Sequence, residues 1–230
     1  MTPARSASNV AAARRAGLGL SFIAVPLVFI FAFAVHPNLT SPRLLGPAEL
    51  VARAHGASLL HVAHALVTLV TGPLVVVAIH LMTVLEKQQR PGWGLVGGTL
   101  AVAGALALAA DKGALCLTMS AVDTLPEADF ANMLPGLLAM FSRQGWLVLL
   151  WGIVLLPIGF FIQALGLLRT RAFPRWRTLF FLLGVAFIGT PDGAEIVNLT
   201  AAVMLAVFFV PCGIELLRGL DAPAEGATGA

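Results

Sequence analysis

Charged residues are scarce in this chain: Asp, Glu, Lys and Arg make up 11% of its 230 residues, whereas 59% are hydrophobic. A soluble domain usually carries about 25% charged residues and needs a solvated face on most of its helices. Long stretches of this sequence offer no such face, so the bilayer is the expected solvent and helices the expected structure. The apolar runs are continuous rather than alternating, which excludes a transmembrane β-barrel.

Cysteine is also rare, and the two copies, Cys116 and Cys212, fall in different apolar runs near opposite membrane faces. That placement excludes a disulfide between them, because bonded cysteines need Cα atoms less than about 7 Å apart. The sequence lacks a Cys-x-x-Cys zinc motif, a Gly-rich phosphate loop, Gly-x-Ser-x-Gly and His-Glu-x-x-His. No complete catalytic set is present, so an enzymatic role is the less favoured interpretation.

A haem held by two histidines would need them at matching depth on two helices. His64 and His80 lie on one predicted helix, about 24 Å apart at the standard rise. A haem with one histidine and a different second ligand stays open, and no cofactor is assigned. The net charge of +3 comes from basic residues in short loops between apolar runs, which is typical of membrane topology and not of nucleic-acid binding.

Six apolar runs are long enough to cross about 30 Å of hydrocarbon. They cover residues 16–35, 58–85, 94–119, 144–168, 177–190 and 195–217. The sequence therefore predicts an all-α, polytopic transmembrane helical bundle that forms a single domain over residues 16–218. Residues 1–15 and 219–230 are expected to be flexible segments. Pro73, preceded by Gly72, predicts a bend in the second span.

The distribution of Lys and Arg predicts the orientation, because these residues are enriched in cytoplasmic loops. With six spans and a cytoplasmic N-terminus, ten basic residues face the cytoplasm and four face outward. The cytoplasmic set is Arg5, Arg14, Arg15, Lys87, Arg90, Arg169, Arg171, Arg175, Arg177 and Arg218. The outer set is Arg43, Arg53, Lys112 and Arg143. Both termini are thus expected in the cytoplasm. A short helix at 47–55 and an amphipathic helix at 129–141 are expected at the outer surface.

Ionisable groups gather near the predicted outer face. His61 and His64 are three residues apart, so they share one face of the second span. Such spacing suits a shared metal ion or a proton relay, or simply two rings at the headgroup level. Asp111 and Lys112 lie at about the depth of His64, or at the interface if the third span ends early. Adjacent helical residues point about 100° apart, so these two are not expected to pair with each other.

The turn before the last span carries Asp192 and Glu195 behind a short fifth span, and Arg143 completes the set of polar candidates. The turn is expected to dip inward and bring both carboxylates into the bundle, or else they cap the last helix. We expect His64, Asp111 and Glu195 at similar depth in the outer third of the membrane. At least two of them should reach one polar cavity.

Residues 141–217 carry the most recognisable motifs. A Gln-Gly pair opens the fourth span, followed by Trp151-Gly152, Leu156-Pro157-Ile158-Gly159 and a basic turn that ends in Phe173-Pro174-Arg175. In this respect the chain resembles the DUF4386 family of bacterial integral membrane proteins. The family has no assigned activity, so the resemblance implies a helical membrane fold and no particular function.

Three functions remain open at this point. The preferred one is a membrane accessory or structural subunit of a larger complex, with lipid or pigment as a ligand. The second is a transporter or ion-coupled protein with an outward vestibule, and the third is a metal-dependent membrane enzyme using the same cluster. Expected partners are the lipid bilayer and other membrane subunits, and the small-residue run 94–104 allows close helix contact within the bundle or with such a subunit.

Overall fold

The computed structural model describes residues 3–37, 39–40, 43–142, 147–189 and 194–219. Within these ranges the fold is all-α and contains no strand, which confirms the predicted class. The helices are α1 (Pro3–Ala34), α2 (Pro47–Ala54), α3 (Ser58–Lys87), α4 (Pro91–Val122), α5 (Glu127–Phe141), α6 (Leu147–Leu168), α7 (Arg175–Phe187) and α8 (Glu195–Leu217).

Four of the described helices are long and apolar enough to cross a membrane: α1 over Asn9–Ala34, α3, α4 and α8. The sequence predicts six crossings. The two further candidates are α6, which has 22 residues, and α7, which has only 13. Large apolar side chains such as Leu69 and Leu117 point outward and are more than 70% exposed, as expected where lipid is the solvent.

Proline and glycine mark several helix ends. Pro47 and Pro91 occupy first-turn positions, where the missing N–H has no helical partner to lose. Gly219 adopts a left-handed conformation directly after α8, which is typical of a helix C-terminus.

One expectation differs from the structure and another stays untested. The helix α1 already begins at Pro3, within the segment expected to be flexible. The helix α3 runs without interruption through Pro73, and the bend there stays a prediction.

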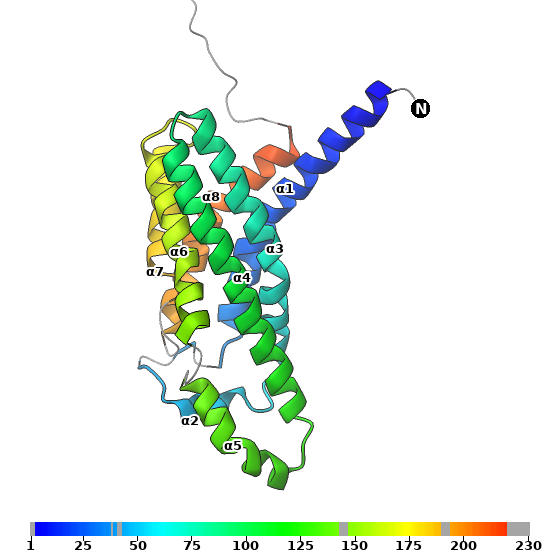
Figure 1. Ribbon diagram of the computed structural model, residues 1–230, viewed down its shortest axis with the longest axis vertical. Helices are drawn as coiled ribbons and strands as arrows, with labels where there is room; N and C mark the ends of the chain where they lie inside the picture. The colour runs from blue at the N-terminus through cyan, green and yellow to red at the C-terminus, as the bar shows by residue number, and fades with distance from the viewer. Residues whose placement is uncertain (1–2, 38, 41–42, 143–146, 190–193, 220–230) are drawn as a thin grey trace, which may run out of the picture.

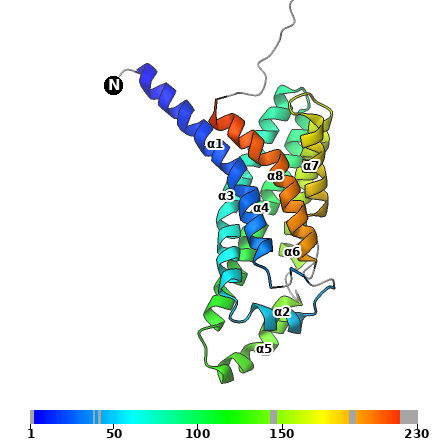
Figure 2. The same ribbon diagram turned by 180° about the vertical axis from the view of Figure 1, so that it is seen from behind.

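Six helices form a closed ring (Figures 1 and 2). Going around it, α1 contacts α3, α3 contacts α4, α4 contacts α6, α6 contacts α7, α7 contacts α8, and α8 contacts α1. The helices α2 and α5 pack on each other at one end of the ring, which we call the capped end. The opposite end carries the α3–α4 and α6–α7 loops with Lys87, Arg90, Arg169 and Arg171, and we call it the basic end.

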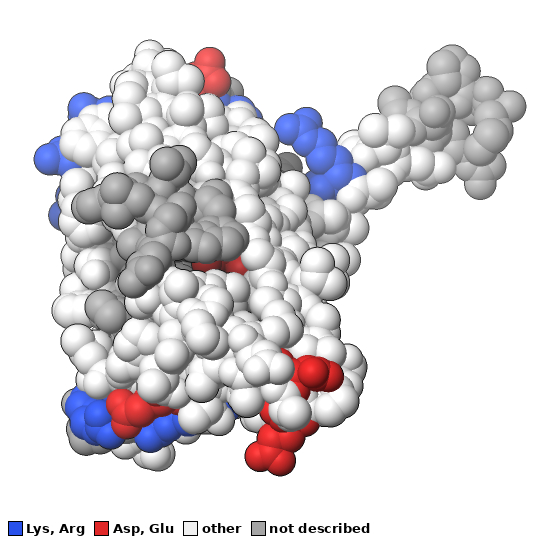
Figure 3. Space-filling view, turned by 60° about the horizontal axis from the view of Figure 1, so that its bottom comes forward, with Lys and Arg blue, Asp and Glu red and all other residues white. Residues whose placement is uncertain are grey.

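Charge is concentrated at the two ends of the molecule, and the surface between them is mostly uncharged in the view of Figure 3. At the basic end, Arg177 of α7 forms a 2.7 Å ion pair with Glu215 of α8. The guanidinium of Arg169 lies over the ring of Trp93, 4.7 Å from its centre. Both contacts join neighbouring helices of the ring at their ends.

The core consists of phenylalanine rings and closely packed small residues. Phe22, Phe160, Phe181, Phe208 and Phe209 are buried and form a network of ring contacts that joins α1, α6, α7 and α8. Such edge-on and stacked pairs add stability beyond the buried apolar area.

The glycines of α4 are used inside the bundle. A Cβ atom at Gly104 would lie 2.1 Å from the backbone nitrogen of Leu156 in α6, and one at Gly159 would lie 2.2 Å from that of Ala101. These approaches leave no space for a side chain, so the two helix backbones are in direct contact. The small-residue run 94–104 was expected to allow close helix contact either within the bundle or with another subunit. In this structure it contributes to the contact between α4 and α6.

Candidate functional site

A cavity of about 570 Å³ lies inside the ring, and residues from all eight helices line it. This size falls within the range of about 300–1,000 Å³ typical of small-molecule sites. One part of the cavity is apolar and is lined by Phe29, Leu74, Phe160, Phe181 and Phe209. The other part lies toward the capped end and contains ionisable side chains. Figure 3, which turns that end forward, shows acidic atoms within a hollow between the helix ends.

Most of the predicted candidate residues contribute to this cavity. His61 and His64 from α3, Asp111 and Lys112 from α4, and Glu195 from α8 all line it. At least two of His64, Asp111 and Glu195 were expected to reach one polar cavity, and all three line this one. Arg143 and Asp192, the two other candidates, lie outside the described residues.

Asp111 and Lys112 form an ion pair with 3.1 Å between Oδ2 and Nζ, so the prediction that they would not pair is wrong. The Cα–Cβ bonds of the two residues point in different directions, which is unfavourable for an ion pair. The four-carbon stem of lysine is nevertheless long enough to bring its ammonium group back to the carboxylate of Asp111. Each side chain is about a quarter exposed, at 26% for Asp111 and 27% for Lys112. The pair therefore lies at the cavity surface and presents a compensated charge.

Glu195 is the first residue of α8 and is almost fully buried, with 2% of its surface exposed. Its Oε1 is 3.6 Å from Nδ1 of His36, and its Oε2 accepts a hydrogen bond of 3.2 Å from Nδ2 of Asn198. The Oδ1 of Asn198 in turn accepts from the Gly189 N–H at 2.8 Å. These contacts connect the chain after α1, the end of α7 and the start of α8, where the helix dipole also favours a carboxylate.

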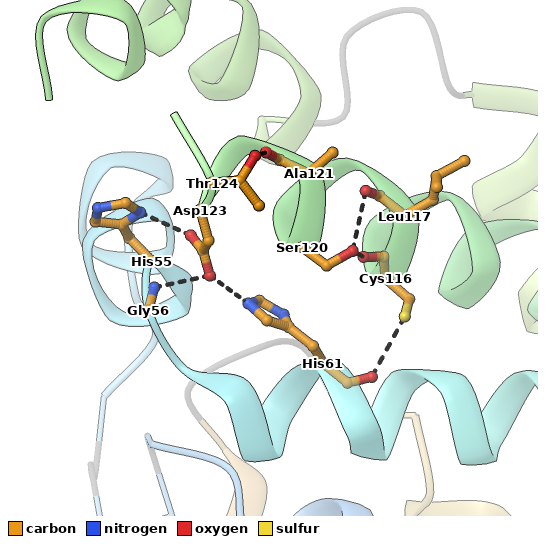
Figure 4. A network of polar contacts seen from close by, with 9 residues as sticks. All are labelled: His55, Gly56, His61, Cys116, Leu117, Ser120, Ala121, Asp123 and Thr124. Carbon is orange, nitrogen blue, oxygen red and sulfur yellow. Dashed lines mark hydrogen bonds and ion pairs between the residues drawn. The ribbon is translucent and has the colours of Figure 1, made fainter. Parts of the chain in front are cut away.

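Asp123 holds together the elements at the capped end (Figure 4). Its Oδ1 is 2.7 Å from Nδ1 of His55, and its Oδ2 is 2.6 Å from Nε2 of His61. The Gly56 N–H also donates to Oδ2 at 3.0 Å. The ring of His55 stacks on Phe130 of α5 with 4.0 Å between centroids. One carboxylate thus links the end of α4, the α2–α3 turn and the start of α3, and His55 extends the link to α5.

The pKa of Asp123 reflects this setting. Burial by itself would raise the pKa, because a desolvated carboxylate is disfavoured. The hydrogen bonds from His61, Gly56 and His55 outweigh that effect and hold the pKa below its usual value. The charged form of Asp123 is therefore the one that the capped end is built to accommodate.

The histidines of α3 differ in their partners. Nε2 of His61 contacts Asp123, whereas Nδ1 of His61 and Nδ1 of His64 are buried and have no hydrogen-bond partner among the described residues. Over the part of the chain that the structure describes, no group of three or more His, Cys, Asp or Glu side chains is placed to hold a metal ion. A metal shared by His61 and His64 would thus depend on these two side chains alone.

Models of known protein families, curated proteins and solved structures were compared with this chain, and none matched. The resemblance to the DUF4386 family stays a prediction.

A shallow apolar groove lies between α6 and α7, lined by Pro157, Ile158, Phe161, Val185, Ala186 and Ile188. Pro157, Val185 and Ile188 also line the central cavity. Between α6 and α7, the side chains of these three residues therefore separate the cavity from the groove. The groove consists only of apolar residues, so lipid chains are its natural contact.

The sequence analysis missed three groups at the site: His36, Arg53 and Asp123. His36 and Arg53 line the cavity, and Asp123 holds His61 at its edge. All three lie outside the long apolar runs, at helix ends or in connecting segments, where a charged residue is expected in any membrane protein. The signal available was their common end of the bundle, since His55, His61 and Asp123 all fall near the predicted outer face.

Proposed function

We propose that this chain is a non-catalytic integral membrane protein that binds a lipid-like small molecule in its central cavity. The observation that carries the proposal is the division of one cavity into an apolar part and a polar part. An amphiphile has the same division: its apolar body would lie among Phe29, Phe160, Phe181 and Phe209, and its head would lie beside His64, Lys112 and Glu195. Apolar walls with a few convergent polar groups are the usual composition of a ligand site.

We further propose six crossings with both termini in the cytoplasm, in the inner membrane of a bacterium and in a fold like that of the DUF4386 family. The closed ring supports six crossings, because α6 and α7 pack within it beside the longer helices α4 and α8. The basic end then faces the cytoplasm. An engineered cysteine near residue 225 should resist an impermeant thiol reagent applied from outside, and labelling there would overturn this topology.

The groove between α6 and α7 supports entry of the ligand from the lipid phase. It shares Pro157, Val185 and Ile188 with the cavity, so small movements of these side chains would join the two spaces. A lipid-like ligand is already concentrated in the membrane and would need no aqueous route. In a larger complex, such a protein would act as an accessory subunit that holds or presents the ligand.

Transport is the second candidate, favoured by the Asp111–Lys112 and His36–Glu195 pairs inside the bundle. Ionisable groups within a membrane protein often mark an ion or proton route. In the described conformation, however, the basic-end residues Lys87, Arg90, Arg169 and Arg171 are not among the residues that line the cavity. Binding requires only the cavity, whereas transport also requires an opening toward the basic end.

Two substitutions on α4 test the binding function. Leu115 lines the cavity, and Leu117, two residues further, faces outward with 72% exposure. Leu115→Trp should fill the cavity, whereas Leu117→Trp adds the same volume on the lipid-facing side. Small molecules are extracted from each protein after purification in mild detergent and quantified by mass spectrometry. We expect the wild type and Leu117→Trp to carry one amphiphile at similar occupancy, and Leu115→Trp to lose it by about tenfold or more, which corresponds to about 1.4 kcal/mol.

Equal occupancy in the two tryptophan variants, with both proteins folded by size-exclusion chromatography, would contradict the proposal. The proposal would also be contradicted if the wild type carried no small molecule and bound none from added lipid. Retention of ligand by Leu117→Trp is the control for a general effect of tryptophan on this helix.

A further inference from the structure

Among the described residues, the ionisable acidic and basic side chains at the polar part of the cavity have interaction partners within the chain itself. Lys112 is paired with Asp111 at 3.1 Å, and Glu195 lies 3.6 Å from His36 and accepts from Asn198. Arg53, the other cation that lines the cavity, also has an interaction partner. A charged head group would have to break one of these contacts or stay unpaired in a poorly solvated site, and both cost free energy.

His64 is different from these residues. Its side chain lines the cavity, and none of the described residues forms a hydrogen bond with it. Its Nδ1 is buried, as is Nδ1 of His61, one helical turn away on the same face, and both atoms are too enclosed for a molecule in the cavity to touch. Nε2 of His64 is not among these buried atoms, so it is the ring nitrogen that a ligand in the cavity can reach. Among the described residues, the polar group that the cavity leaves without a partner is therefore an imidazole nitrogen and not an ion.

We propose that the cavity selects an uncharged, hydroxyl-bearing lipid whose head group hydrogen-bonds to His64. A neutral imidazole offers one N–H donor and one acceptor nitrogen, and a hydroxyl can complement either of them because it both donates and accepts. An uncharged head leaves the Asp111–Lys112 and His36–Glu195 contacts intact. This inference rests on the proposed binding function and adds the chemical class of the ligand.

Three probes with the same oleoyl chain separate the head-group chemistry from the chain: mono-oleoylglycerol, oleate and oleoyl-lysophosphatidylcholine. The first is uncharged and carries hydroxyls, the second is an anion under mildly alkaline conditions, and the third is a zwitterion. Binding of radiolabelled probes to the purified, delipidated full chain in nanodiscs is measured at equilibrium. We expect mono-oleoylglycerol to bind about tenfold more tightly than either charged probe.

Substitutions at His64 then assign the contact. His64→Leu should weaken mono-oleoylglycerol binding by about three- to tenfold, the usual effect of losing one hydrogen bond. His64→Gln keeps a donor and an acceptor at this position and should retain most of the affinity. His80→Leu is the matched control, because His80 lies on the same helix against the ring of Phe22 and does not line the cavity. It should leave binding unchanged.

Each other outcome has a definite meaning. If oleate or oleoyl-lysophosphatidylcholine binds as tightly as mono-oleoylglycerol and Leu115→Trp abolishes that binding, the head-group inference is wrong but the binding function stands. If no probe binds above the level of empty nanodiscs, the head-group inference and the binding function both fail. If His64→Leu and His80→Leu behave alike, His64 is not the contact and the inference is overturned. The comparison of probes uses the unaltered protein, so it decides the question even if a variant does not fold.

Discussion

Near the basic end, helices of the bundle touch backbone to backbone, whereas near the capped end they stand apart around a cavity. A Cβ atom at Gly19 would lie 2.8 Å from the carbonyl oxygen of Gly213, and one at Gly97 would lie 2.7 Å from that of Gly159. By contrast, the nearest atom to a Cβ at Gly113, close to the capped end of α4, is a methyl group of Thr68 at 3.6 Å. The difference lies in the residue types: small residues bring helices together, and ionisable side chains with aromatic rings keep them apart.

This contrast separates two roles within one bundle. Close backbone contacts at one end fix the positions of the helices without polar groups. The other end can then hold a space and several ionisable groups, because its geometry is set elsewhere and by the Asp123 contacts. Buried polar groups with incomplete partners are costly to stability, and they are found where a protein binds something.

The largest expected effect concerns the glycine contacts. Gly104→Ala should destabilise the protein by about 2–4 kcal/mol, because the added methyl overlaps the Leu156 backbone and the two helices must separate. Gly113→Ala, on the same helix, has ordinary van der Waals space and should be neutral or stabilising by up to about 1 kcal/mol. Thermal unfolding of both variants in the same detergent measures the difference. Equal unfolding temperatures would show that the described α4–α6 contact is not present in solution.

An intermediate effect is expected at Asp123. Asp123→Asn should destabilise by about 2 kcal/mol at neutral pH, because the amide cannot accept all three hydrogen bonds that the carboxylate receives. The lowered pKa of Asp123 gives the sign of the pH dependence. The folded state holds this proton less tightly than the unfolded state, so the contribution is complete above the unfolded pKa of about 3.9 and is lost as the pH falls through the folded value.

Unfolding temperatures of the wild type and Asp123→Asn, measured from neutral pH downward, test this expectation. The gap between them should shrink below about pH 4. Asp129→Asn, at an exposed position in the first turn of α5, is the matched control and should change stability by less than about 1 kcal/mol. A gap that does not shrink when the pH falls further below about 4 would contradict this expectation.

The smallest effect is expected at the Asp111–Lys112 pair. Both partners are about a quarter exposed, so screening limits their interaction, and Asp111→Asn should cost about 1 kcal/mol. A double-mutant cycle with Lys112→Met isolates the coupling between the two side chains. Zero coupling would mean that the pair is not formed in the membrane, and a coupling above about 3 kcal/mol would mean that it is more buried than described.

Much of the fold follows from hydropathy and helix-terminus signals. The predicted spans at 58–85 and 195–217 match α3 and α8 closely, and the short helix expected from Pro47 is α2. These elements were predictable because long apolar runs and first-turn prolines are local features of the sequence. The order of helices around the ring was not predictable, since several arrangements bury equivalent apolar faces.

The site was predictable in part for the same reason. Counting residues along the helices predicted that at least two of His64, Asp111 and Glu195 reach one cavity, and all three line it. The contacts of Asp123 could not be found by counting, because they depend on how the α2–α3 turn folds back onto the end of α4. The Asp111–Lys112 pair was missed because backbone direction alone ignores the reach of a lysine side chain.

The shortness of α7 has a consequence for the surrounding lipid. Its 13 residues extend about 20 Å, less than the hydrocarbon thickness of about 30 Å, and its outward face carries Leu179, Leu183 and Phe187. With the six crossings proposed above, lipid next to α7 would have to compress, at a cost of fractions of a kcal/mol per ångström, while the 32-residue α4 imposes no such compression. The bilayer would then be uneven in thickness around the protein, thinnest at the side where the apolar groove lies, and thinner membranes would accommodate the protein best.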